Sequence, residues 1–354
     1  MDFPIFKTKI DGLTDEFDLN SPEGRGKYFE AKAGEEIEKL TQYLKKDAFI
    51  AYMLAKKSAG KGTYARMMME IFGPEYVVHL SVGDIIRDID KEINDPQKRK
   101  ELEEFLKTNY RGFHSLEEIF KAQEDRSTKT LMPTEFILAL VEREIARLPK
   151  KAIFIDGFPR GLDQVSYSLF FRSLVGYRED KDMFILIQIP ETVIDERMKF
   201  RVICPKCHTP RNLKLLPTKF VGHDADTGQF FLMCDSPECN KARMKPKEGD
   251  GLGIENIRAR LDKDEELLKK AFSLYGIPKV LLRNAVPVDR AEEMVDNYEL
   301  TPSFLYSWDD ENKRVVLREE PWAAKDDQGV LSYSLMAPAV VVSLLKQLVE
   351  VLEL

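Results

Sequence analysis

A loop of small residues and lysines lies between a short apolar run and a segment with the pattern of a helix. The apolar run, AFIAYMLA, covers residues 48–55, and the loop, AKKSAGKGT, covers residues 55–63. In such a loop the backbone N–H groups and the N-terminus of the following helix face an anion, so the sequence predicts a phosphate cradle. Lys61 would reach the β- and γ-phosphates of a nucleotide as a point charge. The candidate residues of this loop are Ser58, Ala59, Gly60, Lys61, Gly62 and Thr63.

The loop alone does not decide between a phosphate site and an ordinary turn. Ala55 stands where the usual phosphate-binding motif begins with glycine. A lysine-rich turn between a strand and a helix would have a similar composition, so the interpretation depends on the rest of the chain.

A second group of candidate residues follows another apolar run. This run ends at Asp156 and continues as DGFPRGLDQ over residues 156–164. Doubly wound sheets hold ligands beyond the carboxyl ends of their strands, where Asp156 could orient Mg²⁺-bound water without binding the metal itself. Gly157 and Pro159 predict a fixed turn. Arg160 would then present a planar guanidinium suited to a phosphate.

Two more segments carry residues of the same chemistry, SVGDIIRD at residues 81–88 and LMPTE at residues 131–135. Arg87 could supply a second guanidinium for an acceptor phosphate. Gln164 carries a paired donor and acceptor that could read an adenine edge. Taken singly, each arginine could instead belong to a surface ion pair.

The order and spacing of these segments resemble the adenylate kinase family over residues 48–300. DGFPR, with a glutamine four residues beyond its arginine, is the most specific part of the resemblance. The resemblance implies ATP with Mg²⁺ as the phosphoryl donor, AMP as the acceptor, and ADP as the product. It assigns the adenine-reading role to Gln164 and implies further acceptor-nucleotide contacts from Val82, Met132 and Gly157.

Two residues depart from the pattern of that family. Ser58 stands where adenylate kinases carry glycine; if this position needs φ > 0, the Cβ costs roughly 1 kcal/mol. The Ser58 hydroxyl could instead donate to a phosphate oxygen. Val82 stands where the family often has threonine, so acceptor affinity or base choice could be altered.

Four cysteines occur as two close pairs, CPKC with Cys204 and Cys207, and CDSPEC with Cys234 and Cys239. Four thiolates in tetrahedral geometry suit a closed structural Zn²⁺ site. A unit of this size has too small a core to hold its shape alone, so a metal would supply folding energy. Four reduced structural cysteines, two disulfides, or iron are the alternatives.

Arginines flank the cysteine-containing segment on both sides. By the resemblance, Arg197 would stack on the donor adenine, while Arg201 and Arg260 would close on the transferring phosphates. Arg258 is counted with the nucleotide-binding residues. A further lid arginine expected in the family has no clear counterpart, and the possible substitutes are Arg243, Lys245 and Lys247.

Composition limits the class of protein. The chain has 354 residues, a formal net charge of −7, 43% hydrophobic and 32% charged residues, as in globular proteins. The negative charge does not favour nucleic acid as a partner. No apolar run is long enough to span a bilayer, and the N-terminus lacks a signal-peptide layout. We therefore expect a cytoplasmic protein without membrane contact, by default a monomer.

Short apolar runs alternate with helical patterns, which predicts an α/β fold with a doubly wound parallel sheet of the P-loop NTPase type. Three strands are expected, at residues 48–55, 152–158 and 183–189, with a helix near residues 26–45. We expect a core at residues 48–300 with two mobile insertions, a charged helical acceptor segment at 81–133 and a β-rich lid at 201–253. The flanking segments, 1–47 and 301–354, match no known pattern; the second contains a hairpin-like stretch and an amphipathic closing helix.

The functional hypothesis is reversible phosphoryl transfer from ATP to AMP, carried by Lys61, Arg87, Asp156, Arg160, Arg201 and Arg260. One alternative is a kinase for another nucleoside monophosphate. The other is a nucleotide-binding sensor or scaffold that has lost catalysis.

Overall fold

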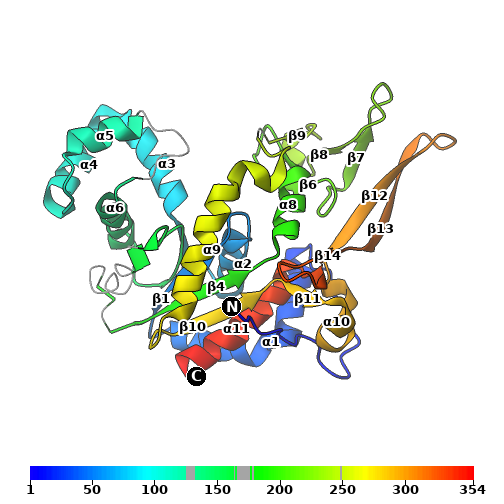
Figure 1. Ribbon diagram of the computed structural model, residues 1–354, viewed down its shortest axis with the longest axis horizontal. Helices are drawn as coiled ribbons and strands as arrows, with labels where there is room; N and C mark the ends of the chain where they lie inside the picture. Colours follow the sequence, from blue (N-terminus) through cyan, green and yellow to red (C-terminus); the bar gives the residue numbers. More distant parts are fainter. Residues whose placement is uncertain (125–131, 163, 166–175, 178, 248) are drawn as a thin grey trace.

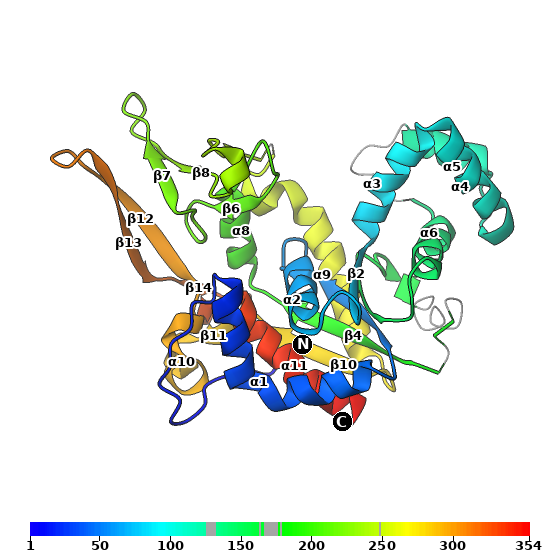
Figure 2. The same ribbon diagram turned by 180° about the vertical axis from the view of Figure 1, so that it is seen from behind.

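The computed structural model describes residues 1–354 except 125–131, 163, 166–175, 178 and 248. Of the predicted motifs, Leu131 and Asp163 therefore lie outside the described residues. Figures 1 and 2 show a central sheet with helices on both faces, a helical arm on one side and a β-rich unit on the other.

The central sheet has five parallel strands in the order β10-β4-β1-β3-β2. This confirms the predicted doubly wound α/β fold. The three predicted strands are β1, β3 and β4; the two edge strands, β2 and β10, were not predicted individually because they are short and only partly buried. The strand bounds are β1 Phe49–Ala55, β2 Val77–Ser81, β3 Ala152–Asp156, β4 Lys181–Gln188 and β10 Lys279–Arg283.

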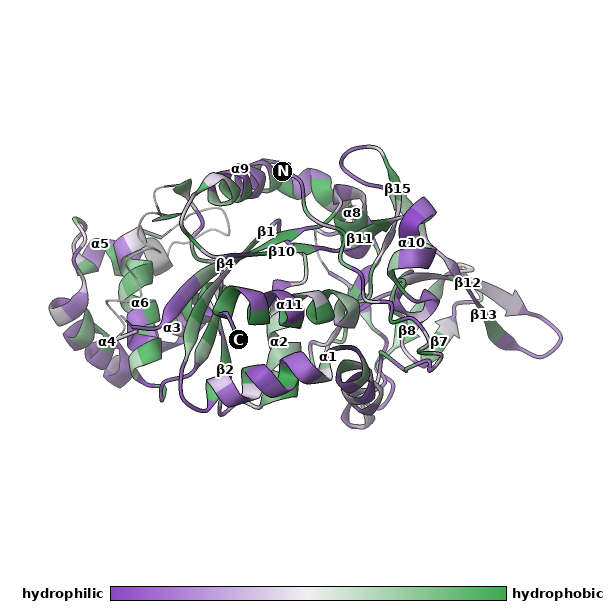
Figure 3. Cartoon of the chain, turned by 90° about the horizontal axis from the view of Figure 1, so that it is seen from below, coloured by the Kyte–Doolittle hydropathy of each residue, from purple (hydrophilic) through white to green (hydrophobic). Residues whose placement is uncertain are grey.

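The strands are apolar because both faces of the sheet are covered. Along β1, Phe49, Ala51 and Met53 pack into one core, and Ile50 and Tyr52 pack into the other. Figure 3 shows the sheet between α9 on one side and α1, α2 and α11 on the other. The main helices are α1 Pro22–Leu44, α2 Lys61–Phe72, α6 Thr134–Ala146, α8 Glu191–Lys199, α9 Arg258–Ser273 and α11 Ala337–Leu352.

The helix predicted near residues 26–45 is α1, which begins four residues earlier, because Ser21 caps it and Pro22 occupies its first turn. The charged insertion is helical in its described part, as predicted. Its helices are α3 Val82–Ile93, α4 Pro96–Asn109 and α5 Leu116–Glu124.

The cysteine-containing unit is β-rich, as predicted. It contains a three-stranded sheet, β6-β5-β9, and a hairpin, β7-β8. We call this unit, residues 201–253, the lid. Its elements are β5 Arg201–Ile203, β6 Pro210–Asn212, β7 Phe220–His223, β8 Phe230–Met233, η1 Pro237–Cys239 and β9 Lys245–Pro246. The short helix η2, Gly253–Ile257, begins at the last residue of the lid.

The remaining elements follow β10. The predicted hairpin is present as β12 and β13, which pair antiparallel and extend beside the lid hairpin (Figure 1). Two short strands, β14 and β15, join β11 in a small sheet. The bounds are β11 Ala285–Pro287, α10 Val288–Met294, η3 Asn297–Glu299, β12 Pro302–Asp309, β13 Arg314–Pro321, β14 Ala323–Lys325 and β15 Leu331–Ser334.

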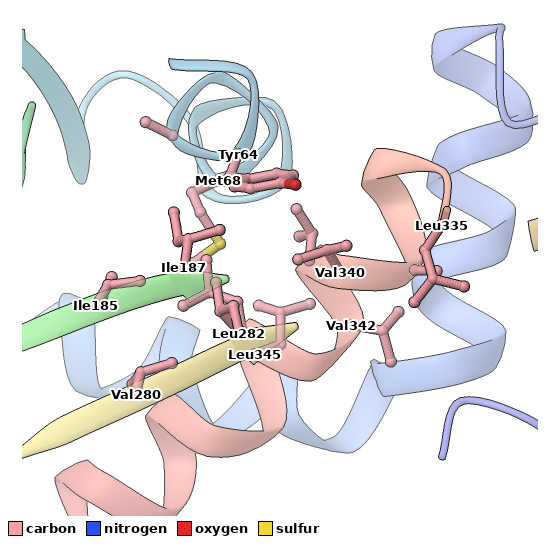
Figure 4. Packing of buried hydrophobic residues seen from close by; sticks show 14 of the residues in the cluster. Tyr64, Met68, Ile185, Ile187, Val280, Leu282, Leu335, Val340, Val342 and Leu345 are labelled. Carbon is pink, nitrogen blue, oxygen red and sulfur yellow. The ribbon is translucent and has the colours of Figure 1, made fainter. Parts of the chain in front are cut away.

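The closing helix α11 is amphipathic, as predicted, because its polar residues Ser343, Lys346, Gln347 and Glu350 follow one stripe at helical spacing. Of its 16 residues, 12 are buried, because the sheet covers one side and α1 another. Figure 4 shows Leu345 beside Leu282 of β10, and Val340 facing Tyr64 of α2. The last residues of the chain therefore share one core with the central sheet.

Candidate active site

The loop between β1 and α2 has the shape of an anion cradle. Gly60 precedes α2 with φ of 99°, a left-handed conformation that suits glycine. Ser58 is also left-handed, with φ of 66°, so the strain considered for this position is present, whereas Ala55 has no positive φ. Lys61 Nζ donates to the Ala55 carbonyl at 3.2 Å and lies 3.6 Å from Asp156 Oδ1.

A cavity of about 180 Å³ lies in front of this loop. It brings together residues that are more than 200 positions apart in sequence, from β1, α2, β2, β3 and α9 and the turns beside them. The predicted site residues that line it are Ser58, Lys61, Asp156, Gly157, Arg160 and Arg260. We call it the phosphate cavity.

Arg87 approaches Arg160 at Gly83. A methyl group added to Gly83 would lie 3.5 Å from Nη1 of Arg87 and 3.7 Å from Nη2 of Arg160. In this conformation Arg87 is paired with Asp84 on the exposed side of α3. The structure thus brings the guanidinium groups of positions 87 and 160 to one place, next to the phosphate cavity.

Gln164 is buried and bonded within the protein. Its Oε1 accepts from the Arg160 N–H at 2.7 Å, and its Nε2 donates to Thr134 Oγ1 at 2.8 Å. The amide retains one N–H and one lone pair beyond these two bonds. Val82 and Met132, the other predicted acceptor contacts, are buried among apolar side chains.

A larger cavity, of about 850 Å³, begins at the other side of the loop. Gly60, Thr63, Arg197 and Arg201 line it, together with residues of both flanking segments. Most of its wall area is apolar, but more than half of its lining residues are polar or charged, among them Arg197, Arg201 and Arg211. The residues from outside 48–300 are Asp18, Leu19, Asn20, Arg25, Thr301, Leu335, Met336, Ala337 and Pro338.

The arginines beside the lid have different partners. Arg201 donates to Asp250 at 2.6 Å within the lid. Arg258 pairs with Glu191 of α8 and with Glu255, and it lines neither of the two cavities. Arg197 lies near Asn284, at 3.5 Å. Arg243, one possible substitute for the missing lid arginine, pairs with Asp224 and lies over the Phe231 ring.

Sequence reasoning missed Lys57 and Asp264, which also line the phosphate cavity. Asp264 Oδ2 accepts from the Lys57 N–H at 2.9 Å, so α9 holds the loop. Burial raises the pKa of Asp264, against the opposing effect of Lys61 and Arg260. Asp264 could have been found from its position in the sequence. It is four residues beyond Arg260, so in a helix the two side chains lie on the same face.

The four cysteines come together, as predicted for a metal site. Their Sγ atoms lie within 4.8 Å of one another, and those of Cys207 and Cys234 are 3.7 Å apart. Sulfurs around a tetrahedral zinc, at Zn–S distances of about 2.3 Å, are about 3.8 Å apart. Hydrogen bonding with Thr209 lowers the pKa of the Cys207 thiol to about 6, whereas burial raises the pKa of Cys234 and Cys239, so these two would need a bound cation to become thiolates. All four thiols are free, and the donor set fits a structural zinc ion.

Among the described residues, no helix combines the length and apolar character needed to cross a membrane.

Known proteins similar to this chain were found by sequence. No family model matches it. The chain is 32% identical to the adenylate kinase of Thermotoga petrophila over 173 residues, which cover 48% of this chain and 67% of that protein. It is 28% identical to the adenylate kinase of Thermotoga neapolitana over 237 residues, covering 66% and 89%. With the adenylate kinase of Mycoplasma mobile, the identity is 24% over 265 residues, covering 74% and 92%.

Proposed function

Because this chain belongs to the adenylate kinase family, we propose that it is a nucleoside monophosphate kinase that transfers the terminal phosphoryl group of ATP to AMP, giving two ADP. The observation that supports this most directly is the phosphate cavity. Lys61, Arg160 and Arg260 line it together with Asp156, at the carboxyl edge of a doubly wound sheet.

Phosphoryl transfer requires in-line positioning and neutralisation of charge more than covalent help. Lys61 and Arg260 would bind the donor phosphates, and Arg87 and Arg160 the acceptor phosphate. No general base is needed, because the attacking oxygen of AMP is already anionic. The Mg²⁺ that accompanies ATP would neutralise further phosphate charge, and Asp156 would orient its bound water.

The larger cavity is the proposed site of the donor nucleoside. It adjoins the loop at Gly60 and Thr63, and Arg197 lies in its wall, where it could stack on a base. The lid adjoins it through Arg201 and Pro210. Closure of the lid and of the acceptor segment at residues 81–133 would exclude water, which would otherwise hydrolyse ATP. We propose residues 48–300 as the catalytic unit with these two insertions, and α11 as an additional part of its core.

Fewer residues support adenine as the acceptor base than support the phosphate site. Gln164 has unused hydrogen-bonding capacity for adenine, whereas Val82 offers no hydroxyl. A kinase for another nucleoside monophosphate is therefore the second candidate. The left-handed Ser58 in the phosphate loop favours a third, a nucleotide-binding sensor without turnover, because strain at this position could disturb the cradle.

One assay separates the three candidates. Purified protein is given Mg²⁺-ATP with AMP, CMP, UMP or GMP, and the formation of diphosphates is measured. We expect the highest kcat/KM with AMP, and a loss of roughly 10²–10³-fold in kcat for Lys61→Met, as when one preorganised charge-stabilising group is removed.

If kcat/KM were higher with CMP, UMP or GMP, that monophosphate, and not AMP, would be the acceptor. If the wild type bound nucleotide but formed no more diphosphate than Lys61→Met, the result would contradict the kinase and support the sensor.

A further inference from the structure

Three lysines occur within six residues of the phosphate loop, and the structure gives them different environments. The Lys56 side chain is buried and surrounded by acids. Its Nζ lies 3.0 Å from Glu191, 3.3 Å from Glu265 and 3.1 Å from Asp327. Because these carboxylates already neutralise its charge, Lys56 is a structural cation that joins the loop to three distant segments.

Lys57, the next residue, lies on the side of the loop that faces the phosphate cavity. Its side chain is half-buried, and among the residues that the structure describes no carboxylate forms an ion pair with it. Its backbone N–H is occupied by Asp264. The ammonium group is therefore the donor that Lys57 has left to offer to a ligand in the cavity.

The charges around this ammonium group are mainly positive. Arg260 of α9 and Lys247 and Arg201 of the lid act on it, and the acid that opposes them, Asp250, is bonded to Arg201. Burial and these like charges lower the pKa of Lys57. Cations held together in a partly buried place repel one another unless an anion neutralises them.

We propose that Lys57 is a second polyphosphate-binding lysine of the loop, acting beside Lys61 and facing the lid. This inference rests on the proposed phosphate site. It also supplies a cation on the loop where the lid lacks an expected arginine. Lys61 would bind the phosphates from the base of the cavity, and Lys57 from the side that the lid approaches.

The test uses the full chain and inorganic tripolyphosphate, a ligand without a base or a transferable nucleotide. Its Kd is measured by calorimetry for the wild type, Lys57→Gln and Lys57→Arg. We expect Lys57→Gln to weaken binding by about tenfold or more, as for the loss of one charge-assisted contact. Lys57→Arg, which keeps the charge, is expected to stay within about threefold of the wild type.

Two control variants separate this role from structural effects. Lys45→Gln removes the same charge at an exposed, remote position and is expected to leave Kd unchanged. Lys56→Gln is expected to lower the melting temperature, because the Lys56 side chain is buried and paired with three acids. Lys57→Gln is not, because Lys57 forms no ion pair with a described residue.

A pH series adds a readout that a structural role would not affect. The lowered pKa means that Lys57 loses its charge at lower pH than an ordinary lysine. Wild-type affinity for tripolyphosphate should therefore fall as the pH rises through this pKa. The fall should be smaller in Lys57→Gln, in which this group is absent.

Equal Kd values for the wild type and Lys57→Gln would overturn the inference and leave the proposed function intact. Tripolyphosphate binding that depends on Lys57, without any diphosphate formation from ATP and AMP, would support the inference and contradict the proposed function. If the wild type did not bind tripolyphosphate at all, the phosphate site and the inference would both be wrong.

Discussion

The central sheet and the lid are stabilised in different ways. The sheet has an apolar core on each face, and helices from both ends of the chain, α1 and α11, contribute to one of these cores. Among the described residues of the lid, five form a buried cluster, Cys204, Leu232, Cys234, Cys239 and Met244, and three of these are cysteines. Apolar burial can account for the first region, whereas the second is too small for it.

The lid has two sources of stability outside its own apolar core. One is the proposed zinc ion. The other is the β12-β13 hairpin, which contacts the lid through two stacked ring pairs. The ring centroids of His223 and Trp308 are 4.6 Å apart, and those of Phe230 and Tyr306 are 5.5 Å apart. The Tyr306 hydroxyl also donates to the Leu213 carbonyl. A segment that is proposed to close over a ligand can thus be kept folded without a large core fixing it to the sheet.

The largest effect is expected from removing the metal. Cys234→Ser, or chelation, would remove binding free energy of roughly 10 kcal/mol for a structural zinc site, so the lid should unfold while the sheet stays folded. We expect a loss of bound zinc, rapid proteolysis within residues 201–253, and a roughly hundredfold loss of activity from misplaced groups.

The control for this variant is Lys206→Gln, an exposed position between the first two cysteines. Wild-type zinc content in Cys234→Ser would show that Cys234 is not needed to hold the metal. Wild-type activity and protease resistance after the zinc has been lost would show that the lid does not depend on a metal.

An intermediate effect is expected from a cavity in the sheet core. Leu345→Ala in α11 removes a fully buried side chain, which costs about 2–5 kcal/mol of unfolding free energy. Denaturant unfolding should show this loss for the whole protein, while zinc content remains normal. Glu350→Ala on the same helix is exposed and serves as the control. A change below about 0.5 kcal/mol would show that α11 is not part of the core.

The smallest effect is expected at the contact between the lid and the hairpin. Trp308→Ala removes a stacked ring pair, worth about 0.5–1.5 kcal/mol beyond its buried area. Hydrogen exchange of residues 213–233 should become faster, with little change in global stability. Leu305→Ala, exposed on the same strand, should have no such effect. Unchanged exchange in Trp308→Ala would mean that the hairpin does not stabilise the lid.

Local patterns in the sequence were enough to predict much of this protein. Strand, loop and helix followed from the apolar run before Ala55 and the small residues up to Thr63. The cysteine cluster was predictable because the cysteines of each pair stand close together in the sequence. The edge strands β2 and β10 and the buried character of α11 were not predictable in this way, because both depend on neighbours far along the chain.

The sequence by itself determined which residue types stand at the carboxyl ends of the strands, and hence the family and the chemistry of the crevice. Only the tertiary structure decided which cations are available there. Lys56 and Lys57 are adjacent and chemically identical, yet acids from positions 191, 265 and 327 pair with the first, whereas no carboxylate among the described residues forms an ion pair with the second. Coulomb energy depends on the distance between charges in space, and the fold sets that distance independently of separation along the chain.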